Sequence, residues 1–227
     1  MAADIPKQEQ ASELEPEDLS WLARFPADER VIGPIQRSEA LALFGLLRVL
    51  RPRLVVEMGF LHGDSTAVLC AATAGCEGAR VISVDRDHNA AAVDALRARY
   101  PHLEFQRADQ RAARLPDDGA PIDFLFVDCS HDFDINCAMW AALEPRLAPN
   151  AVVMVHDTGL WADGPTPAQY RGWGQAGEAR GARGWFHQPA EVRFVRWVTD
   201  THADWARMDF LCTHVWRHGF TLLQRRL

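Results

Sequence analysis

The stretch from residue 54 to residue 157 alternates short apolar runs with longer helical patterns, and this alternation constrains the fold most. Apolar runs without polar alternation are typical of strands buried on both faces. Strands that alternate with helices form parallel sheets covered by helices on both sides. The sequence therefore predicts an α/β fold with a doubly wound sheet. The expected strands are 54–57, 81–84, 103–107, 122–127 and 151–155, and the expected helices are 65–74, 90–100 and 135–147.

The flanking segments complete the expected single domain, residues 16–227. Residues 1–15 are polar and acidic, which predicts a disordered tail. Helices are expected within 16–52, one of them over 38–50 with Ser38 as its cap. Residues 158–188, rich in Gly, Pro, Arg and aromatic side chains, are expected to form a lid or insertion loop. Two final strands, 206–213 and 220–224, bring the sheet to seven strands and close it as an antiparallel hairpin.

Charge and composition exclude several classes of protein. The net charge of the 227 residues is −7, which argues against nucleic acid as a partner because phosphate binding needs a basic surface. No apolar run approaches the roughly 20 residues of a membrane span, and we expect no membrane partner. The N-terminus lacks a basic-then-apolar signal pattern, so the expected location is cytoplasmic. The cysteine count is five and no Cys-x-x-Cys occurs, so free thiols are expected.

A glycine turn follows the first expected strand, in the pattern Glu57-x-Gly59-x-x-x-Gly63. A strand, a glycine turn and a helix N-terminus in this order form a cradle for a small ligand. Glycine has no Cβ, so its backbone can approach the ligand closely. The spacing differs from the G-x-G-x-x-G of dinucleotide-binding proteins. The turn and the start of its helix supply the candidate cofactor-binding residues Glu57, Gly59, Phe60, Gly63, Ser65 and Thr66.

Polar residues also end each of the other expected parallel strands. Ligands of open α/β sheets bind at the carboxyl ends of the strands, so these residues are expected to share one rim. Asp85, with Arg86 beside it, can accept both hydrogen bonds of a ribose diol. Asp109 and Gln110 are candidates for the adenine amino group. Asp85 alone does not separate the possible nucleotide cofactors, because dinucleotide enzymes use an acid in the same way.

The fourth and fifth strands end in the segments Asp128-Cys129-Ser130-His131-Asp132-Phe133 and His156-Asp157-Thr158. Together with the glycine turn, they resemble class I S-adenosylmethionine (SAM) methyltransferases, in the branch of small-molecule and sugar O-methyltransferases whose relatives include proteins described as cephalosporin hydroxylases. The resemblance covers about residues 30–225 and implies a Rossmann-like fold. The branch typically reads Asp-Gly-Asp-His-x-Tyr at the fourth strand, and this chain departs from it at Cys129, Ser130 and Phe133.

The resemblance implies SAM as cofactor and a small-molecule hydroxyl, of a secondary metabolite or sugar, as substrate. It also implies a divalent cation (Mg²⁺ or Mn²⁺) held by Asp128, His156 and Asp157. Asp128, which also faces the cofactor, and His131, as the base, are the implied catalytic residues. His156 stands where many members have an acid, and imidazole favours Mn²⁺, Fe²⁺, Zn²⁺ or Ni²⁺ over Mg²⁺.

Other readings stay open at this point. The enzyme can work without a metal, with His131 or His156 as base. A metal oxygenase related to the hydroxylases would use His131, His156 and Asp157. A nucleotide-linked oxidoreductase and a non-catalytic module of the same fold are further alternatives. The N-terminal helices either cap the active site or join copies of the chain in a homo-oligomer.

Overall fold

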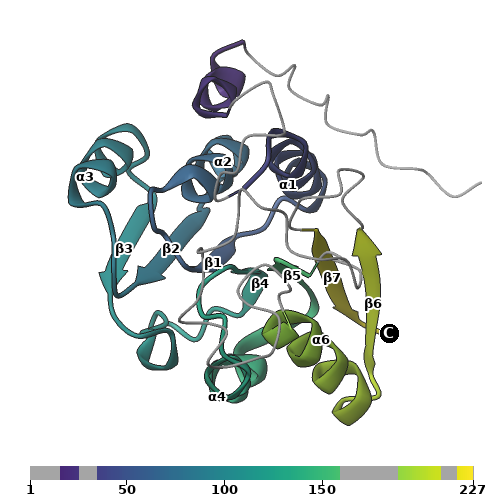
Figure 1. The fold of residues 1–227 in the computed structure, drawn as a ribbon. Helices are drawn as coiled ribbons and strands as arrows, with labels where there is room; N and C mark the ends of the chain where they lie inside the picture. Colours follow the sequence, from purple (N-terminus) through teal and green to yellow (C-terminus); the bar gives the residue numbers. More distant parts are fainter. Residues whose placement is uncertain (1–15, 26–34, 159–188, 211–218, 227) are drawn as a thin grey trace, which may run out of the picture.

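The computed structural model describes residues 16–25, 35–158, 189–210 and 219–226 (Figure 1). The predicted tail (1–15), the predicted lid apart from its first residue and part of the link between the last two strands lie outside the described residues. The described chain forms a sheet of seven strands in the order β3-β2-β1-β4-β5-β7-β6. The strands are β1 Leu54–Met58, β2 Arg80–Asp85, β3 Leu103–Arg107, β4 Ile122–Val127, β5 Leu147–His156, β6 Trp205–Phe210 and β7 Phe220–Arg225.

Five of these strands are parallel and the last two are antiparallel. β1 pairs with β2 and β4 in parallel, and β2–β3 and β4–β5 are parallel as well. β7 lies antiparallel between β5 and β6. The predicted fold class, a mostly parallel sheet with a C-terminal antiparallel hairpin, is therefore confirmed. The crossover from β3 to β4 passes over β1 and β2. The strand order therefore reverses at the boundary between β1 and β4.

Helices cover both faces of the sheet. α1, α2 and α3 lie on one face, whereas α4 and α6 lie on the other (Figure 1). Alternate strand residues serve the two resulting cores, because successive side chains of a strand point to opposite faces. Val55 and Phe124 belong to the first core, and Val56 and Leu125 to the second. The helices are η1 Pro16–Arg24, α1 Arg37–Leu50, α2 Asp64–Thr73, α3 Ala90–Arg99, η2 Gln110–Ala112, α4 Phe133–Leu143, η3 Glu144–Arg146 and α6 Pro189–Thr201.

Helix α4 differs from its prediction at both ends. It begins at Phe133 rather than 135, because the side chain of Asp132 accepts hydrogen bonds from the backbone N–H groups of Asp134 and Ile135. It ends at Leu143 and continues as the 3₁₀ turn η3, which contains Pro145. Proline has no N–H and disfavours a continuous α-helix.

Helix α1 begins one residue before the predicted range. Its N-cap is Gln36, so Ser38 lies inside the first turn and the predicted Ser38 cap is wrong. The backbone N–H of Gln36 donates instead to Oε2 of Glu39 at 2.8 Å. An acid at the third helical position can bind the N-cap backbone in this way, and so satisfies a donor that the helix leaves without a partner.

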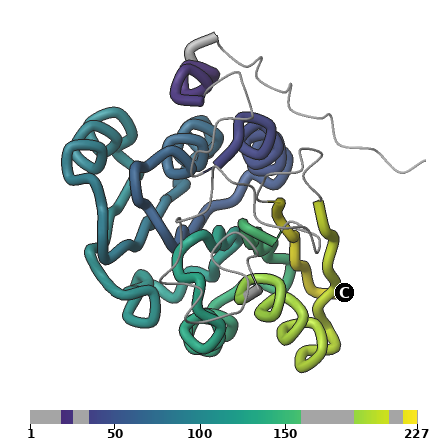
Figure 2. Tube along the Cα trace, in the orientation of Figure 1, coloured from purple at the N-terminus to yellow at the C-terminus, as the bar shows by residue number. Residues whose placement is uncertain are grey.

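The short helix η1 packs beside α1 and α2, as the chain trace shows (Figure 2). Its Trp21 is buried, and the ring lies 5.1 Å from that of Phe44 on α1. Arg24 forms an ion pair with Asp64 at 2.8 Å and donates to the backbone oxygen of His62. The N-terminal segment is thereby joined to the glycine turn and the start of α2.

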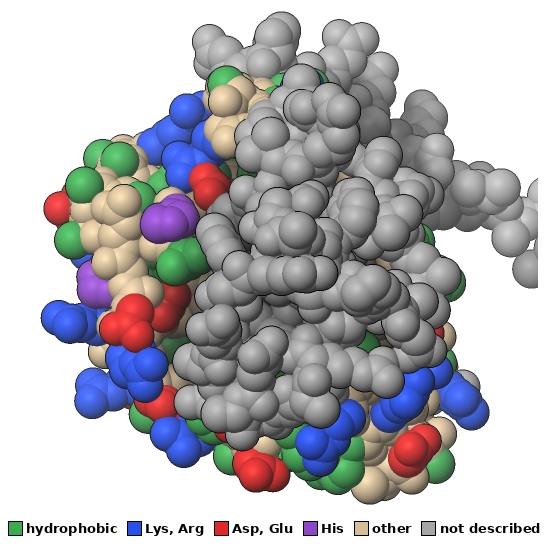
Figure 3. Space-filling model, viewed as in Figure 1, with side chains coloured by type: hydrophobic (Ala, Val, Ile, Leu, Met, Phe, Trp, Pro, Cys, Tyr) green, Lys and Arg blue, Asp and Glu red, His purple; other side chains and the backbone are tan. Residues whose placement is uncertain are grey.

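Charged side chains of both signs are interspersed around the described surface on the face seen in Figure 3. Among the helices of the described ranges, none combines the length and the apolar character that crossing a membrane requires.

Candidate active site

Gly59 is the point where the ends of β1, β2 and β4 meet. It has φ of 108°, and a Cβ atom at this position would lie 1.9 Å from the backbone oxygen of Asp128. The N–H of Gly59 donates to the oxygen of Val84 at 2.9 Å, and the N–H of Asp128 donates to the oxygen of Met58 at 2.8 Å. A close approach combined with a positive φ requires glycine. The turn and the end of β4 are therefore held against each other.

The second glycine of the turn, Gly63, has φ of 76° and is the N-cap of α2. A Cβ here would lie 2.7 Å from the Phe60 ring and 2.7 Å from Leu96. Phe60 itself is buried, and its ring centroid lies 5.1 Å from that of Phe105. The side chain of Phe60, a predicted cofactor residue, thus packs in the core and supports the turn. Its backbone is part of the turn itself.

Glu57 lies beneath the turn and is fully buried. Its carboxylate accepts hydrogen bonds from Ser65 at 2.6 Å and Thr66 at 2.5 Å, and from the hydroxyl of Ser83. Burial raises the pKa of Glu57 to about 7, although the three hydroxyl donors act in the opposite direction. Two predicted cofactor residues of α2, Ser65 and Thr66, therefore both donate to a third, Glu57, and fasten α2 to the sheet.

Asp85 closes the turn from the end of β2. Its Oδ2 accepts the backbone N–H groups of Phe60 and Leu61, both at 2.8 Å, and its Oδ1 accepts that of Asp87 at 2.9 Å. A carboxylate offers about four lone-pair positions, so these three donors leave room for one more. Asp85 therefore both shapes the turn and keeps acceptor capacity at the rim of the sheet.

The remaining predicted cofactor residues lie at the ends of β2 and β3. Arg86 is exposed and pairs with Asp87 at 3.1 Å. Asp109 caps η2 and binds Arg111, whose hydrogen bonds lower the pKa of Asp109 to about 2. Gln110 is buried and donates to Oδ1 of Asn136 on α4 at 3.0 Å.

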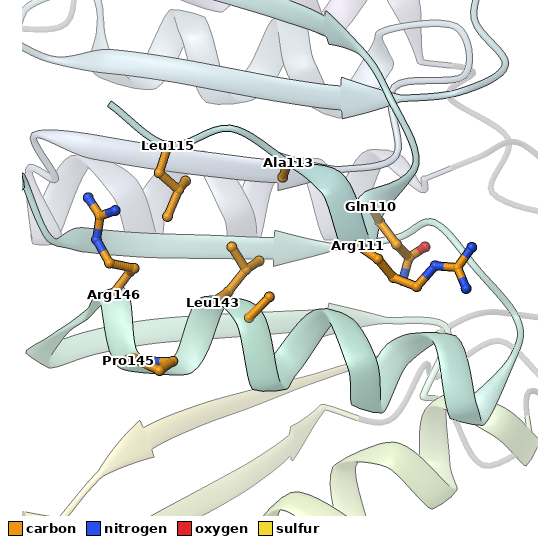
Figure 4. Close-up of a pocket in the computed structure, with 8 residues that line it drawn as sticks. Gln110, Arg111, Ala113, Leu115, Leu143, Pro145 and Arg146 are labelled. Atoms are coloured by element: carbon orange, nitrogen blue, oxygen red, sulfur yellow. The ribbon is translucent and has the colours of Figure 1, made fainter. Parts of the chain in front are cut away.

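Gln110 also borders a hollow of about 320 Å³ between η2 and the C-terminal end of α4 (Figure 4). Among the predicted site residues only Gln110 lines it. The hollow lies against Arg146 and Pro145 and is separate from the histidines discussed next.

A cluster of acids and histidines occupies the ends of β4 and β5. Nδ1 of His156 lies 3.4 Å from Oδ1 of Asp128 and 3.3 Å from Oδ1 of Asp157. Burial alone lowers the pKa of His156, but the surrounding carboxylates, Asp128 first, raise it well above its ordinary value. Asp157 has φ of 61°, a left-handed conformation that Asp adopts more readily than most residues. The structure thus brings the three predicted metal ligands together.

His131 lies beside this cluster, in the loop before α4. Its Nδ1 is 2.6 Å from Oε1 of Glu191 in the first turn of α6, and 3.8 Å from Oδ2 of Asp157. Burial alone lowers the pKa of His131, but the hydrogen bond and charge of Glu191, with the charge of Asp157, raise it to about 9. Burial raises the pKa of Glu191, and its bond to His131 opposes that shift.

Two residues of the cluster were not predicted from the sequence. Glu191 binds His131, and Glu39 of α1 lies 3.1 Å from Nε2 of His156. Each is an acid in the first turn of its helix. An acid there is usually explained by the helix dipole, so the sequence carries no distinct signal for either residue.

The donor set of Asp128, His156 and Asp157 fits a divalent cation. One ligand atom from each lies within 4.8 Å of the others. His156 carries a carboxylate partner on its other nitrogen, as metal-binding histidines usually do. Two carboxylates and one imidazole suit first-row ions such as Mn²⁺ better than Mg²⁺, which prefers oxygen ligands.

Comparison with protein families gives a match over these same elements. Residues 56–158 match the family described as "Methyltransferase domain". This part of the chain is similar to methyltransferase domains. The matched range runs from β1 to the residue after Asp157, so it holds the glycine turn and all three candidate metal ligands. Glu39 and Glu191 lie outside it. The search of curated proteins found no match.

Solved methyltransferase structures share the fold. The O-methyltransferase TomG from Streptomyces achromogenes, described as involved in tomaymycin synthesis and in complex with SAM, has a TM-score of 0.63 at 19% identity, covering 93% of this chain and 90% of its own. The cofactor-bound Rv0187 from MTB has 0.61 at 20%, covering 92% and 88%. The O-methyltransferase from Bacillus cereus in complex with SAH has 0.58 at 17%, covering 99% and 94%. The predicted Rossmann-like methyltransferase fold is thus confirmed.

Proposed function

We propose that this protein is a SAM-dependent methyltransferase that methylates a hydroxyl of a small molecule. The observation that carries the proposal is the contact at Gly59, which joins a cofactor-type turn to the buried acid–histidine cluster. The structural relatives described with SAM or SAH support the cofactor. The description of TomG, an O-methyltransferase of tomaymycin synthesis, supports a secondary metabolite or a similar small molecule as the acceptor.

The glycine turn would hold the cofactor. Gly59 and Gly63 have no Cβ atoms, and α2 begins directly after Gly63, so the first N–H groups of the helix lie next to the turn. The remaining acceptor position of Asp85 suits a ribose hydroxyl. SAM supplies the electrophile, a methyl group on a sulfonium, so the protein has only to orient the partners and remove a proton.

Asp128, His156 and Asp157 would hold a divalent cation at the end of β4 and β5. A cation here supplies Lewis acidity, which lowers the pKa of an acceptor hydroxyl. The two carboxylates would balance its charge, and His156 would contribute Nδ1.

His131 would act as the base. The short contact with Glu191 fits an Nδ1–H donor. In the neutral ring, which the raised pKa of His131 makes the main form only at alkaline pH, Nε2 is left to receive the proton of the acceptor hydroxyl. Glu191 would hold the ring in that tautomer and balance the positive charge that His131 gains. The side chain of His131 is 23% exposed and that of Glu191 is 6% exposed. This difference fits a role in which His131 contacts the acceptor and Glu191 lies behind it.

The proposal is tested with purified protein by adding SAM, SAH or NAD(P) and following thermal unfolding. SAM and SAH should raise the melting temperature, since a ligand that binds only the folded state stabilises it. Methyl transfer to a panel of phenolic, sugar and polyketide hydroxyls is then measured. A shift with NAD(P) but not with SAM or SAH would contradict the proposal.

A second candidate is methyl transfer without a metal. It is favoured by the His131–Glu191 pair, which can accept a proton with no cation present. EDTA followed by Mn²⁺ or Mg²⁺ separates the two: activity that EDTA abolishes and Mn²⁺ restores supports the cation, and activity that EDTA leaves intact supports the metal-free enzyme. The hydroxylase-like reading predicts oxygen uptake with Fe²⁺, and its histidine His131 is already engaged by Glu191 at Nδ1.

A further inference from the structure

Glu39 reaches the acid–histidine cluster from α1, which precedes the matched domain. Its Oε2 lies 3.1 Å from Nε2 of His156, a residue 117 positions away. Both side chains are buried, with exposed fractions of 6% and 0%. A buried carboxylate is costly unless a partner compensates it, so the contact with His156 helps to keep Glu39 in this position.

The two ring nitrogens of His156 face acids on opposite sides. Nε2 faces Glu39, whereas Nδ1 faces Asp128 and Asp157. A neutral ring that donates from Nε2 presents the lone pair of Nδ1 to two carboxylate oxygens. Three lone pairs directed toward one another repel strongly in a buried site. A proton on Nδ1 or a metal cation relieves this repulsion, and a cation placed among the three atoms makes all of them favourable ligands.

We propose that Glu39 is a positioning residue that fixes His156 as the Nε2–H tautomer, and so presents Nδ1 to a divalent first-row metal ion. This inference rests on the cation site of the proposed function. A carboxylate partner makes the imidazole a stronger donor. The Glu39–His156 pair would therefore favour ions that bind nitrogen well, such as Mn²⁺, over Mg²⁺.

Glu39 also makes a second contact that serves only the fold, and the test has to distinguish its loss from the loss of the contact with His156. The same Oε2 accepts the backbone N–H of Gln36 and so caps α1. Loss of the cap alone would destabilise α1. It would not change the preference of the protein for one metal ion over another.

The test measures the affinity of the full chain for Mn²⁺, by the EPR signal of the free ion, and for Mg²⁺, by competition. Three proteins are compared: the unaltered chain, Glu39→Gln and Glu39→Ala. Gln keeps an oxygen that can accept both N–H groups, so it guards against a misfolded Ala variant. We expect Mn²⁺ to bind roughly 10–100-fold more weakly to Glu39→Ala, with a smaller loss for Gln. The ratio of Mn²⁺ to Mg²⁺ affinity should fall in both variants.

Leu47→Ala is the matched control, because Leu47 is a fully buried residue of α1. This change loosens α1 without removing the carboxylate, and the Mn²⁺ to Mg²⁺ ratio should stay unchanged. Unaltered affinities in both Glu39 variants would overturn the proposal, as would an equal loss in Leu47→Ala.

Asp157→Ala separates this inference from the proposed function. If the unaltered chain binds Mn²⁺ and Asp157→Ala does not, the cation site stands and the Glu39 variants decide the inference alone. If the unaltered chain binds no Mn²⁺, or Asp157→Ala binds it equally well, the cation site and the role of Glu39 both fall. SAM binding and methyl transfer that resist EDTA would then still support the metal-free methyltransferase.

Discussion

The two halves of the candidate site handle their acids differently. On the β1–β2 side, Glu57 binds hydroxyls and Asp85 binds backbone N–H groups. On the β4–β5 side, the acids face histidines, and the partners come from helices 60 and 117 residues away in sequence. The first half is a turn built from contacts between residues at most 26 positions apart in sequence. The second is a charge cluster assembled by the tertiary fold.

This difference indicates which half is suited to hold a ligand in place and which is suited to bind a proton or a cation. Acids that accept neutral N–H and O–H groups form a fixed surface for a ligand whose position has to be constant. Carboxylates and imidazoles in mutual contact respond to the arrival of a proton or a cation. The four predictions below test this division, from the largest expected effect to the smallest.

Replacing His131, the proposed base, should remove most of the catalysis and leave cofactor binding at the other half intact. His131→Ala should lower kcat for methyl transfer by roughly 10²–10⁴-fold, because general-base catalysis contributes that much. Binding of SAH, measured by calorimetry, should be unchanged. His202→Ala, at the residue that follows the end of α6, serves as the control. Weaker SAH binding together with unaltered kcat would reverse the division.

Gly59 joins the two halves, so its substitution should disturb both. Gly59→Ala places a Cβ 1.9 Å from the oxygen of Asp128 at φ of 108°. We expect a loss of roughly 2–4 kcal/mol in the free energy of unfolding from backbone strain and overpacking. Urea denaturation measures it. Gly45→Ala in α1, where a Cβ meets nothing within 4 Å, should be neutral or stabilising. Equal effects at the two glycines would show that the close contact is unimportant.

Glu57 is an exception to this division, because it should make the stability of the turn half sensitive to pH. Its folded pKa, about 7, is above the ordinary value of 4.5, so its contribution to stability is present below pH 4.5 and is lost as the pH rises to about 7. Between pH 5 and pH 8 the unaltered chain should lose up to about 3 kcal/mol more than Glu57→Gln does. Denaturation curves of both proteins across this range give the difference, in which groups common to the two cancel. Parallel curves would mean that Glu57 is ionised throughout.

The link from η1 to the turn should matter least. Arg24 is 36% exposed where it pairs with Asp64, so Arg24→Ala should change the free energy of unfolding by under about 1 kcal/mol. The effect should decrease as salt is added. Arg86→Ala, in another exposed pair, provides the comparison. A loss well above that of Arg86→Ala would show that η1 is needed to hold the turn.

The two halves also differ in how much of them the sequence predicts. Gly59 and Asp85 could be found because a turn and the acid of the next strand follow local rules of spacing. The strand ends placed Asp128, His156 and Asp157 together because parallel strands end at one edge. Glu39 and Glu191 could not be found, since nothing in a first-turn acid tells which distant side chain it will meet. Even the start of α1 at Arg37 depends on the side chain of Glu39 accepting the Gln36 N–H, and the expected Ser38 cap was wrong.

Because Glu39 precedes β1, its proposed influence on the choice of metal ion is separable in sequence from the sheet. Under this proposal, substitutions in α1 during evolution would change which metal ion binds, and every residue of the glycine turn could stay the same. If Glu39 sets the preference, replacing α1 with the corresponding helix of a relative would give this sheet the metal-ion preference of that relative.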